Sequence, residues 1–337
     1  MTIPPGRTEK FNDQSLDLKL RPNIWNEYIG QGAVKKNLQI LLKAAEERGE
    51  PIEHLLLYGP AGLGKTTLAH LIAKEAQASM KITSGPTIER VGDLASILTN
   101  LNPGEILFID EVHRLNKLIE EVLYSAMEAR SLNIIIGKGP SARTIQLELS
   151  PFTLIAATTR ISLLSSPLRS RFSGGTYRLN FYSPEEIETI LARSAKILNV
   201  DIEPDARREI ALRSRATPRI ANHLLKRCRD YAQVQRKPVL DVKTAQETFK
   251  LLEMDDAGLE PSDRRLLEIL ITKFNGGPVG LNTLAAATSE EEGTIEEVYE
   301  PYLIQLGFID RTPKGRVATP RAYEHLGIKA PKQDKLL

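Results

Sequence analysis

Cysteine and long apolar runs are scarce in this sequence. Cys228 is the only cysteine among 337 residues, which excludes a disulfide within the chain and a cysteine-based metal cluster. Residues 1–10 carry prolines and charges in place of the apolar stretch of a secretory signal. No apolar run approaches the ~20 residues that cross a bilayer. We therefore expect a cytoplasmic protein that does not associate with a membrane.

The sequence also lacks an excess of charge of either sign. Its 45 Lys and Arg residues nearly balance 43 Asp and Glu residues, and the net charge of +2 indicates little about partners. Hydrophobic residues make up 41% of the chain, enough for well-packed cores, and the length predicts two or three domains. One local patch is basic, because residues 311–335 hold seven basic groups against two acidic ones.

Residues 59–67 match the phosphate-loop pattern G-x-x-x-x-G-K-S/T. Residues 54–58 before them, His-Leu-Leu-Leu-Tyr, predict a buried strand, and residues 68–76 after them predict a helix. Glycines let backbone N–H groups point at phosphate oxygens, and the N-terminus of a helix favours negative charge. Lys65 is then suited to reach the β- and γ-phosphates, and Thr66 to ligate Mg²⁺. The nucleotide-binding residues predicted here are Gly59, Gly62, Gly64, Lys65, Thr66 and Thr67.

An acidic pair follows a second buried strand. Residues 106–109 are apolar and run into Asp110 and Glu111. Alone, this pattern fits a strand that simply ends at the surface. On the same sheet as the phosphate loop, Asp110 is suited to hold Mg²⁺ through water and Glu111 to orient or deprotonate the attacking water. We therefore predict hydrolysis of the nucleotide, with Lys65 and Glu111 as catalytic residues and with Thr66 and Asp110 as the metal site.

Short apolar strands alternate with helical stretches through the first 182 residues. The expected strands are 54–58, 80–83, 106–109 and 154–157, and the expected helices are 33–48, 68–76, 92–100 and 118–129. Such alternation is typical of a parallel sheet that is covered by helices on both faces. We predict an α/β, P-loop nucleotide-binding domain over residues 1–182.

One segment interrupts this alternation. Residues 132–136 and 144–149 flank a glycine-containing stretch and predict a β-hairpin with a long tip. Its first strand is more apolar than one solvated face requires. The segment fits a sheet edge packed on the core as well as a surface on which a partner docks.

The chain becomes helical from Ser183, where Ser-Pro-Glu-Glu predicts a capping box. Another helix is expected from 217–218 to Tyr231, and a boundary near 254–260. We predict an all-α lid domain over residues 183–254.

The last segment, residues 255–337, combines helices with a second hairpin. The expected helices are 262–274, 281–287 and one that starts at Thr294, and the expected hairpin strands are 308–310 and 317–318. Three helices followed by a hairpin predict a winged-helix domain.

Three arginines are candidates for contact with the nucleotide. Arg169 and Arg171 follow the strand that ends at 158–159, and Arg219 lies just inside a lid helix. An arginine that meets the γ-phosphate, often from a neighbouring subunit, accelerates phosphoryl transfer by ~10³–10⁵. Arg219 is placed to reach the phosphates from the lid.

Together these motifs resemble those of AAA+ ATPases, and over almost its whole length the chain resembles the RuvB family of Holliday-junction branch-migration motors. The stretches that carry the narrower resemblance are 20–22, 28–31, 81–86, 136–143, 217–222 and 300–305. The resemblance implies an ATP- and Mg²⁺-dependent DNA motor of recombination and repair, which works as a homo-hexameric ring. It also implies a RuvA-type partner bound at the 132–149 hairpin, and leaves open a RuvC-type resolvase as a further partner.

The resemblance also implies roles for single residues within one subunit. Leu20 and Arg21 would border the adenine, and Tyr182 and Arg219 would close the site from the lid. Thr159, with Thr158 as the alternative, would sense the γ-phosphate.

Between subunits, the resemblance makes Arg171 the catalytic finger that enters the neighbour's site, with Arg169 as the second choice. It also places at the nucleotide a group where the family usually has Glu-Asp-Phe, namely Glu128, Ala129 and Arg130. Further departures from the family pattern are Ala61, Glu292 and the stretch 173–176.

The wing of the last domain is better suited to DNA than the helix before it. That helix carries Glu296, Glu297 and Glu300, whose carboxylates repel phosphates. Arg311 and Arg316 on the wing suit contact with the DNA backbone irrespective of sequence. We assign these two arginines to DNA binding, as the resemblance also implies.

Two other functions fit part of the sequence. A clamp loader or replication initiator would share the ATPase motifs but not the 138–143 stretch and the terminal wing. A nucleotide switch with a winged helix that does not hydrolyse ATP would have no need of Glu111 and Arg171.

Overall fold

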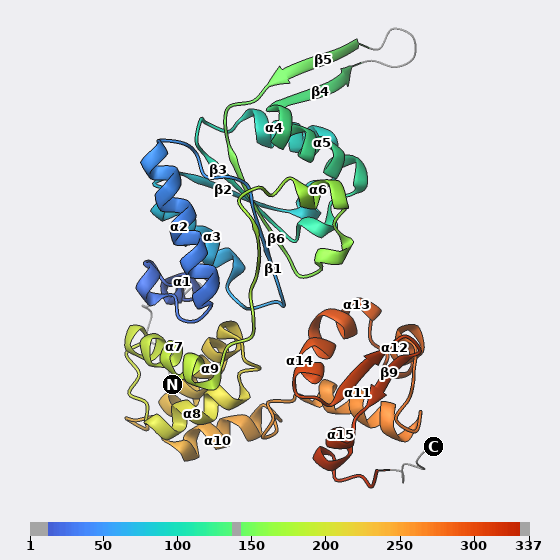
Figure 1. Ribbon diagram of the computed structural model, residues 1–337. Coiled ribbons are helices and arrows are strands. Elements are labelled where there is room, and N and C mark those ends of the chain that lie inside the picture. Colours follow the sequence, from blue (N-terminus) through green and yellow to red (C-terminus); the bar gives the residue numbers. More distant parts are fainter. Residues whose placement is uncertain (1–12, 137–142, 331–337) are drawn as a thin grey trace, which may run out of the picture.

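The computed structural model describes residues 13–136 and 143–330. It contains a parallel-sheet domain, a helical lid and a winged-helix domain in chain order (Figure 1). Three segments considered in the sequence lie outside the described residues: 1–10, the hairpin tip at 137–142, and 331–337. Among the residues that are described, no helix is long and apolar enough to cross a membrane.

The central sheet has five strands in the order β2-β3-β6-β1-β7, and all neighbouring pairs are parallel. The strands are β1 (Leu55–Tyr58), β2 (Met80–Ser84), β3 (Ile106–Asp110), β6 (Thr153–Thr158) and β7 (Thr176–Arg178). The predicted parallel sheet is confirmed. The edge strand β7 was missed because its Thr-Tyr-Arg sequence is partly exposed and lacks an apolar run.

Helices cover both faces of this sheet (Figure 1). Leu55 and Leu57 of β1 pack in one apolar cluster with α2 (Gly32–Arg48) and α3 (Lys65–Glu75). Leu56 points into the opposite cluster, which contains residues of α4 (Val91–Thr99), α5 (Lys117–Ala129) and α6 (Ser166–Ser170). Burial on both faces explains why the strands read as continuous apolar runs. Because the strands are parallel, the carboxyl ends of β1, β3 and β6 meet at one edge.

The predicted hairpin forms a sheet of its own. Strands β4 (Ser131–Ile136) and β5 (Arg143–Glu148) pair antiparallel with each other and project from the end of α5 (Figure 1). Leu132 is buried in the core at the base of the hairpin, whereas Ile145 is exposed. The hairpin is therefore not an edge of the central sheet. Its role as a docking surface remains a prediction.

The lid consists of four helices that pack on the sheet domain. They are α7 (Pro184–Ile197), α8 (Pro204–Arg213), α9 (Pro218–Val234) and α10 (Val242–Leu251). The predicted capping box is confirmed, because Ser183 N donates to Glu186 Oε2 at 2.9 Å and Glu186 N donates to Ser183 Oγ at 3.2 Å. Leu191 and Leu224 belong to the same apolar cluster as Leu68 of α3, so the lid and the sheet domain share one core. Helix α1 (Asp13–Leu20) precedes α2 of the sheet domain in the sequence.

The winged-helix domain has a separate core, which includes Leu267, Leu284 and Leu303. Its elements are α11 (Pro261–Thr272), α12 (Leu281–Thr288), α13 (Glu292–Thr294), η6 (Ile295–Tyr299), α14 (Glu300–Gln305), β8 (Ile309–Thr312), β9 (Gly315–Ala318) and α15 (Pro320–His325). The third predicted helix starts at Glu292 rather than at Thr294, and its middle, η6, has π-helical geometry.

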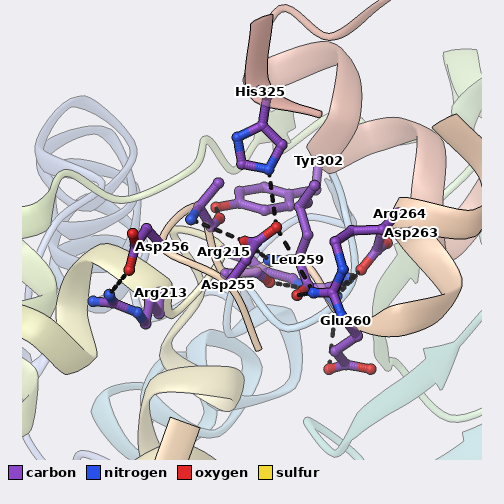
Figure 2. Close-up of polar contacts among 12 residues, drawn as sticks. Arg213, Arg215, Asp255, Asp256, Leu259, Glu260, Asp263, Arg264, Tyr302 and His325 are labelled. Carbon is purple, nitrogen blue, oxygen red and sulfur yellow. Dashed lines mark hydrogen bonds and ion pairs between the residues drawn. The ribbon is translucent and has the colours of Figure 1, made fainter. Parts of the chain in front are cut away.

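Ion pairs join the lid to the winged-helix domain (Figure 2). Arg215 pairs with Asp263 at the start of α11, and both side chains are buried. Arg215 Nε also donates to Gly258 O at 3.2 Å, and Arg213 pairs with Asp256. Within the winged-helix segment, Tyr302 Oη donates to Ala257 O at 2.6 Å and His325 Nε2 lies 2.9 Å from Asp255 Oδ2, which fixes the stretch that follows the lid.

Removal of Arg215 is expected to destabilise this joint strongly. An Arg215→Ala change would leave the buried Asp263 carboxylate without its charge partner, which costs about 3–5 kcal/mol. The double change Arg215→Met with Asp263→Leu leaves no unpaired buried charge and should cost less than Arg215→Ala, although it also removes the hydrogen bond from Glu260 N to Asp263 Oδ2 at 2.8 Å. Urea unfolding measures each free energy, with the exposed Arg236→Ala as the matched control. Equal losses for Arg215→Ala and Arg236→Ala would contradict the prediction.

Candidate nucleotide-binding and hydrolysis site

The phosphate loop connects the end of β1 to the start of α3. Gly59, Gly62 and Gly64 have φ values of +142°, +80° and +92°, a region that glycine adopts without a steric cost. A Cβ at Gly59 would lie 2.5 Å from the carbonyl oxygen of Leu179, and one at Gly62 would lie 3.3 Å from Arg219 Cβ. The glycines thus let the loop pass between β7 and the lid, with the N-terminus of α3 available to an anion.

Lys65 is buried against the loop. Its Nζ donates to Gly59 O at 2.8 Å and to Pro60 O at 3.0 Å. Burial lowers the pKa of Lys65, whereas the carboxylates of Glu111 and Asp110 raise it. The ammonium group is therefore held by neutral carbonyl groups, and a phosphate would offer it a stronger, charge-assisted partner.

Asp110 and Glu111 leave the sheet at the end of β3. Thr66 Oγ1 lies 3.4 Å from Asp110 Oδ2, so two oxygen ligands of the type that Mg²⁺ prefers are close together. Glu111 has a left-handed φ of +48°, which is uncommon for a residue with a side chain. A Cβ at Gly85 would lie 2.3 Å from Glu111 O. Glycine at position 85 therefore makes room for the turn that carries Glu111.

Two side chains hold the Glu111 carboxylate. Thr159 Oγ1 donates to Glu111 Oε2 at 3.1 Å, and His113 Nδ1 lies 3.2 Å from the same oxygen. Thr158 Oγ1 in turn contacts His113 Nδ1 at 3.0 Å. Of the two candidate threonines, Thr159 is the one that meets Glu111. His113 was not assigned from the sequence, although the spacing Asp-Glu-x-His after a buried strand was a usable signal.

A cavity of about 720 Å³ lies between the phosphate loop and the lid, within the size range of small-molecule sites. It also reaches Glu260 and Pro261 at the start of the winged-helix domain. Gly59 and Thr159 act behind its lining, through their contacts with Lys65 and Glu111. The predicted site residues that line the cavity are Leu20, Arg21, Gly62, Gly64, Lys65, Thr66, Thr67, Asp110, Glu111, Tyr182 and Arg219.

Arg193 of the lid fixes the segment that was expected to border the adenine. Its Nη1 donates to Leu20 O at 2.8 Å and its Nη2 donates to Arg21 O at 3.0 Å. The same Nη2 pairs with Glu27 Oε2 at 3.1 Å. No local pattern marks Arg193, because these carbonyl partners lie more than 170 residues away in the sequence.

Arg171 lies outside this cavity, together with the 128–130 stretch. Its Nη2 pairs with Glu128 Oε2 at 2.8 Å, and its side chain is 37% exposed. The stretch that follows it is fixed by the sheet, because Gly174 N donates to His54 O at 3.0 Å. Arg171 is thus held at the surface of the chain beside Glu128.

The two wing arginines have different environments. The Arg311 side chain is 57% exposed. Arg316 is only 9% exposed, and its Nε and Nη2 donate to the two carboxylate oxygens of the buried Glu300 at 2.5 and 3.3 Å. This two-point contact holds Arg316 against Glu300 in the chain without DNA, and the assignment of Arg316 to DNA binding stays a prediction. The sequence did not reveal this contact, because Glu300 lies on the preceding helix.

Three family models match consecutive parts of the chain. Residues 20–179 match the Holliday junction DNA helicase RuvB P-loop domain, residues 182–255 the RuvB AAA lid domain, and residues 256–327 the RuvB C-terminal winged helix domain. The chain belongs to the RuvB family. The predicted resemblance is therefore confirmed, and membership of this P-loop ATPase family implies nucleotide binding and ATP hydrolysis.

Individual relatives within the RuvB family match over nearly the whole chain. The chain is 58% identical over 326 residues to the Holliday junction branch migration complex subunit RuvB of Koribacter versatilis, covering 96% of this chain and 90% of that protein. The same-named protein of Chloroflexus aggregans is 56% identical over 322 residues, with 96% and 92% covered. The solved Thermotoga maritima RuvB Holliday junction branch migration motor has a TM-score of 0.86 and 49% identity, covering 93% of this chain and 100% of that chain.

Glu111→Gln is expected to abolish most ATP turnover without loss of ATP binding. The amide keeps the shape of the side chain but cannot accept a proton, and loss of a general base typically costs ~10²–10⁴ in rate. Thr159→Val should lower kcat less, because Thr159 is expected to orient Glu111 but not to take the proton itself. Steady-state hydrolysis and nucleotide titration measure these effects, with the exposed Glu121→Gln of α5 as the control. Wild-type turnover by Glu111→Gln would contradict this role.

Proposed function

We propose that this chain is the ATP-driven subunit of a branch migration complex, which moves the crossover of a Holliday junction along DNA. The observation that carries the proposal is that Thr66, Asp110 and Glu111 line one cavity. The same cavity also reaches Glu260 and Pro261 at the start of the winged-helix domain. The names of the two curated relatives and of the Thermotoga maritima motor support the choice of substrate.

In the proposed reaction, ATP lies in the cavity with its β- and γ-phosphates on the loop and on Lys65. Thr66 and Asp110 would hold Mg²⁺, which neutralises charge that develops on the phosphates. Glu111 accepts a proton from the attacking water while the bond between the γ-phosphorus and the bridging oxygen breaks. Thr159 holds Glu111 toward that water, and Arg219 closes the site from the lid.

We further propose a ring of six subunits in which each cavity is completed by a neighbour. Arg171 is partly exposed and lies outside the cavity of its own chain, so it is suited to enter another one. Glu128, its ion-pair partner, would release it on assembly, with Ala129 and Arg130 at the same interface. Such a finger stabilises charge in the transition state of phosphoryl transfer.

The proposed DNA contacts are Arg311 and Arg316 on the wing, of which Arg311 is exposed and Arg316 is paired with Glu300 in the chain without DNA. The β4–β5 hairpin is the proposed docking surface for a RuvA-type junction-binding protein, because it projects from the sheet domain (Figure 1). Since chromosomal DNA is the proposed substrate, the proposed location is the cytoplasm.

Mixed rings test the shared site. Arg171→Ala and Glu111→Gln proteins should each be nearly inactive with Mg²⁺-ATP and junction DNA, yet hydrolyse ATP when mixed. In the mixture, an Arg171→Ala subunit keeps its own Glu111 and receives Arg171 from a Glu111→Gln neighbour. The matched control mixes Glu111→Gln with Lys65→Ala, where every site keeps a defect of its own. Absence of recovery at any mixing ratio would count against a finger from the neighbour.

Substitution of the two wing arginines should have different consequences. Arg311→Ala is expected to weaken DNA binding about equally for all sequences, and to lower the salt-dependence slope of the binding constant by about 1. Arg316→Ala should in addition cost about 3–5 kcal/mol of stability, because it leaves the Glu300 carboxylate buried and unpaired. Anisotropy titrations at several salt concentrations and urea unfolding separate the two. A stability loss in Arg311→Ala together with none in Arg316→Ala would contradict this prediction.

A further inference from the structure

Arg160 connects the hydrolysis site to the winged-helix domain. It directly follows Thr159, and its side chain crosses to η6. Arg160 Nη2 forms an ion pair with Glu296 Oε2 at 3.0 Å, and Arg160 Nε forms one with Glu297 Oε1 at 2.9 Å. All three side chains are about one quarter exposed, at 25%, 26% and 26%. Carboxylates that make η6 a poor DNA surface therefore have a partner within the chain.

Glu296 is shared between two arginines. Its Oε2 faces Arg160, while its Oε1 pairs with Nη2 of the exposed Arg311 at 2.9 Å. One carboxylate thus lies between an arginine at the end of strand β6 and the arginine proposed to meet DNA. A phosphate that binds Arg311 must compete with Glu296 for it.

The other end of this connection is close to Glu111. The backbone N–H of Arg160 donates to Thr158 Oγ1 at 3.0 Å, and the neighbouring Thr159 holds the Glu111 carboxylate. Burial lowers the pKa of the adjacent His113, while the carboxylates of Glu111 and Glu297 raise it. Glu297 of the winged-helix domain and Arg160 thus act on the pKa of His113 in opposite directions, and His113 Nδ1 lies 3.2 Å from Glu111 Oε2.

We propose that Arg160 is a positioning residue that couples the orientation of Glu111 to DNA bound at Arg311, through Glu296 and Glu297. The inference rests on the proposed function for the identity of the ligand at Arg311. DNA that captures Arg311 leaves Glu296 to Arg160 and shifts the end of β6, which carries Thr159. Coupling of this kind is reciprocal. If DNA at Arg311 changes the affinity for the nucleotide by some factor, the nucleotide changes the affinity for DNA by the same factor.

The chemistry of the contact suits a coupling that forms and breaks. Partly exposed ion pairs contribute little to stability, because water screens the charges and competes for them. The buried pair between Arg215 and Asp263 at the lid joint differs, because its separation would leave a charge buried without a partner and without access to water. The winged-helix domain is therefore firmly joined to the lid and loosely joined to the sheet domain.

Two variants of one ion pair give opposite predictions for DNA affinity. Arg160→Ala leaves Glu296 to Arg311 and should weaken binding of a four-way junction. Glu296→Gln releases Arg311 and removes a negative charge, so it should tighten binding. A merely structural role would move both affinities in the same direction. Anisotropy titrations of the full chain measure the affinities, with Arg178→Ala and Glu291→Gln, both exposed, as matched controls.

Turnover provides the second readout. The ratio of kcat with saturating junction DNA to kcat without DNA should fall toward one in Arg160→Ala and in Glu297→Gln, with little change in KM for ATP. The control variants should keep the wild-type ratio. The charge-swapped protein Arg160→Glu with Glu297→Arg should regain part of it, and thermal melts of every variant verify folding.

The inference is overturned if both affinities shift in one direction or remain at the wild-type value, or if Arg160→Ala keeps the wild-type kcat ratio. A wild-type chain whose kcat does not respond to DNA would overturn it as well. If the wild type moves no junction but the affinities shift oppositely, the proposed function fails and the coupling stands. If the wild type moves junctions and these shifts are absent, the coupling alone fails.

Discussion

The hydrogen bond from Thr159 to Glu111 joins two strands of the sheet at their carboxyl ends, and the proposed chemistry depends on it. Glu111 sits on a left-handed turn after β3, so its direction is determined by the groups that meet its carboxylate. Thr159 and His113 supply these contacts from adjacent positions at the same edge. A parallel sheet places strand ends side by side, which is why the proposed base Glu111, the proposed sensor Thr159 and the phosphate loop lie at one edge although they are far apart in sequence.

The three domains are connected by contacts of different strength. The lid shares an apolar core with the sheet domain and is tied to the winged-helix domain by a buried ion pair (Figure 2). A movement of the lid around the nucleotide would therefore carry the winged-helix domain with it. The ion pairs of Arg160 are partly exposed, and they join the hydrolysis edge to the wing by a second, weaker route. Together the two routes offer a physical path from a phosphate in the cavity to a phosphate of DNA.

Local motifs predicted the elements of the site well, because their chemistry depends on neighbours in the sequence. The phosphate loop, the strand before Asp110 and the capping box at Ser183 each constrain only a few consecutive residues. Contacts between distant segments were not predictable. Arg193 finds its carbonyl partners in the segment at Leu20 and Arg21, and Arg160 finds its carboxylates on η6. The ion pair of Arg316 with Glu300 was missed for the same reason, since a basic residue on a wing is usually solvated unless a carboxylate lies beneath it.

Branch migration of a synthetic four-way junction most directly tests whether hydrolysis at Glu111 moves DNA. The crossover of a junction with homologous arms is followed with wild-type protein, Mg²⁺-ATP and a RuvA-type partner, in parallel with the Glu111→Gln protein, which should still bind ATP. We predict movement by the wild type, and none by Glu111→Gln or with a non-hydrolysable ATP analogue. Equal movement by the wild type and Glu111→Gln would contradict the claim that ATP hydrolysis at Glu111 powers branch migration.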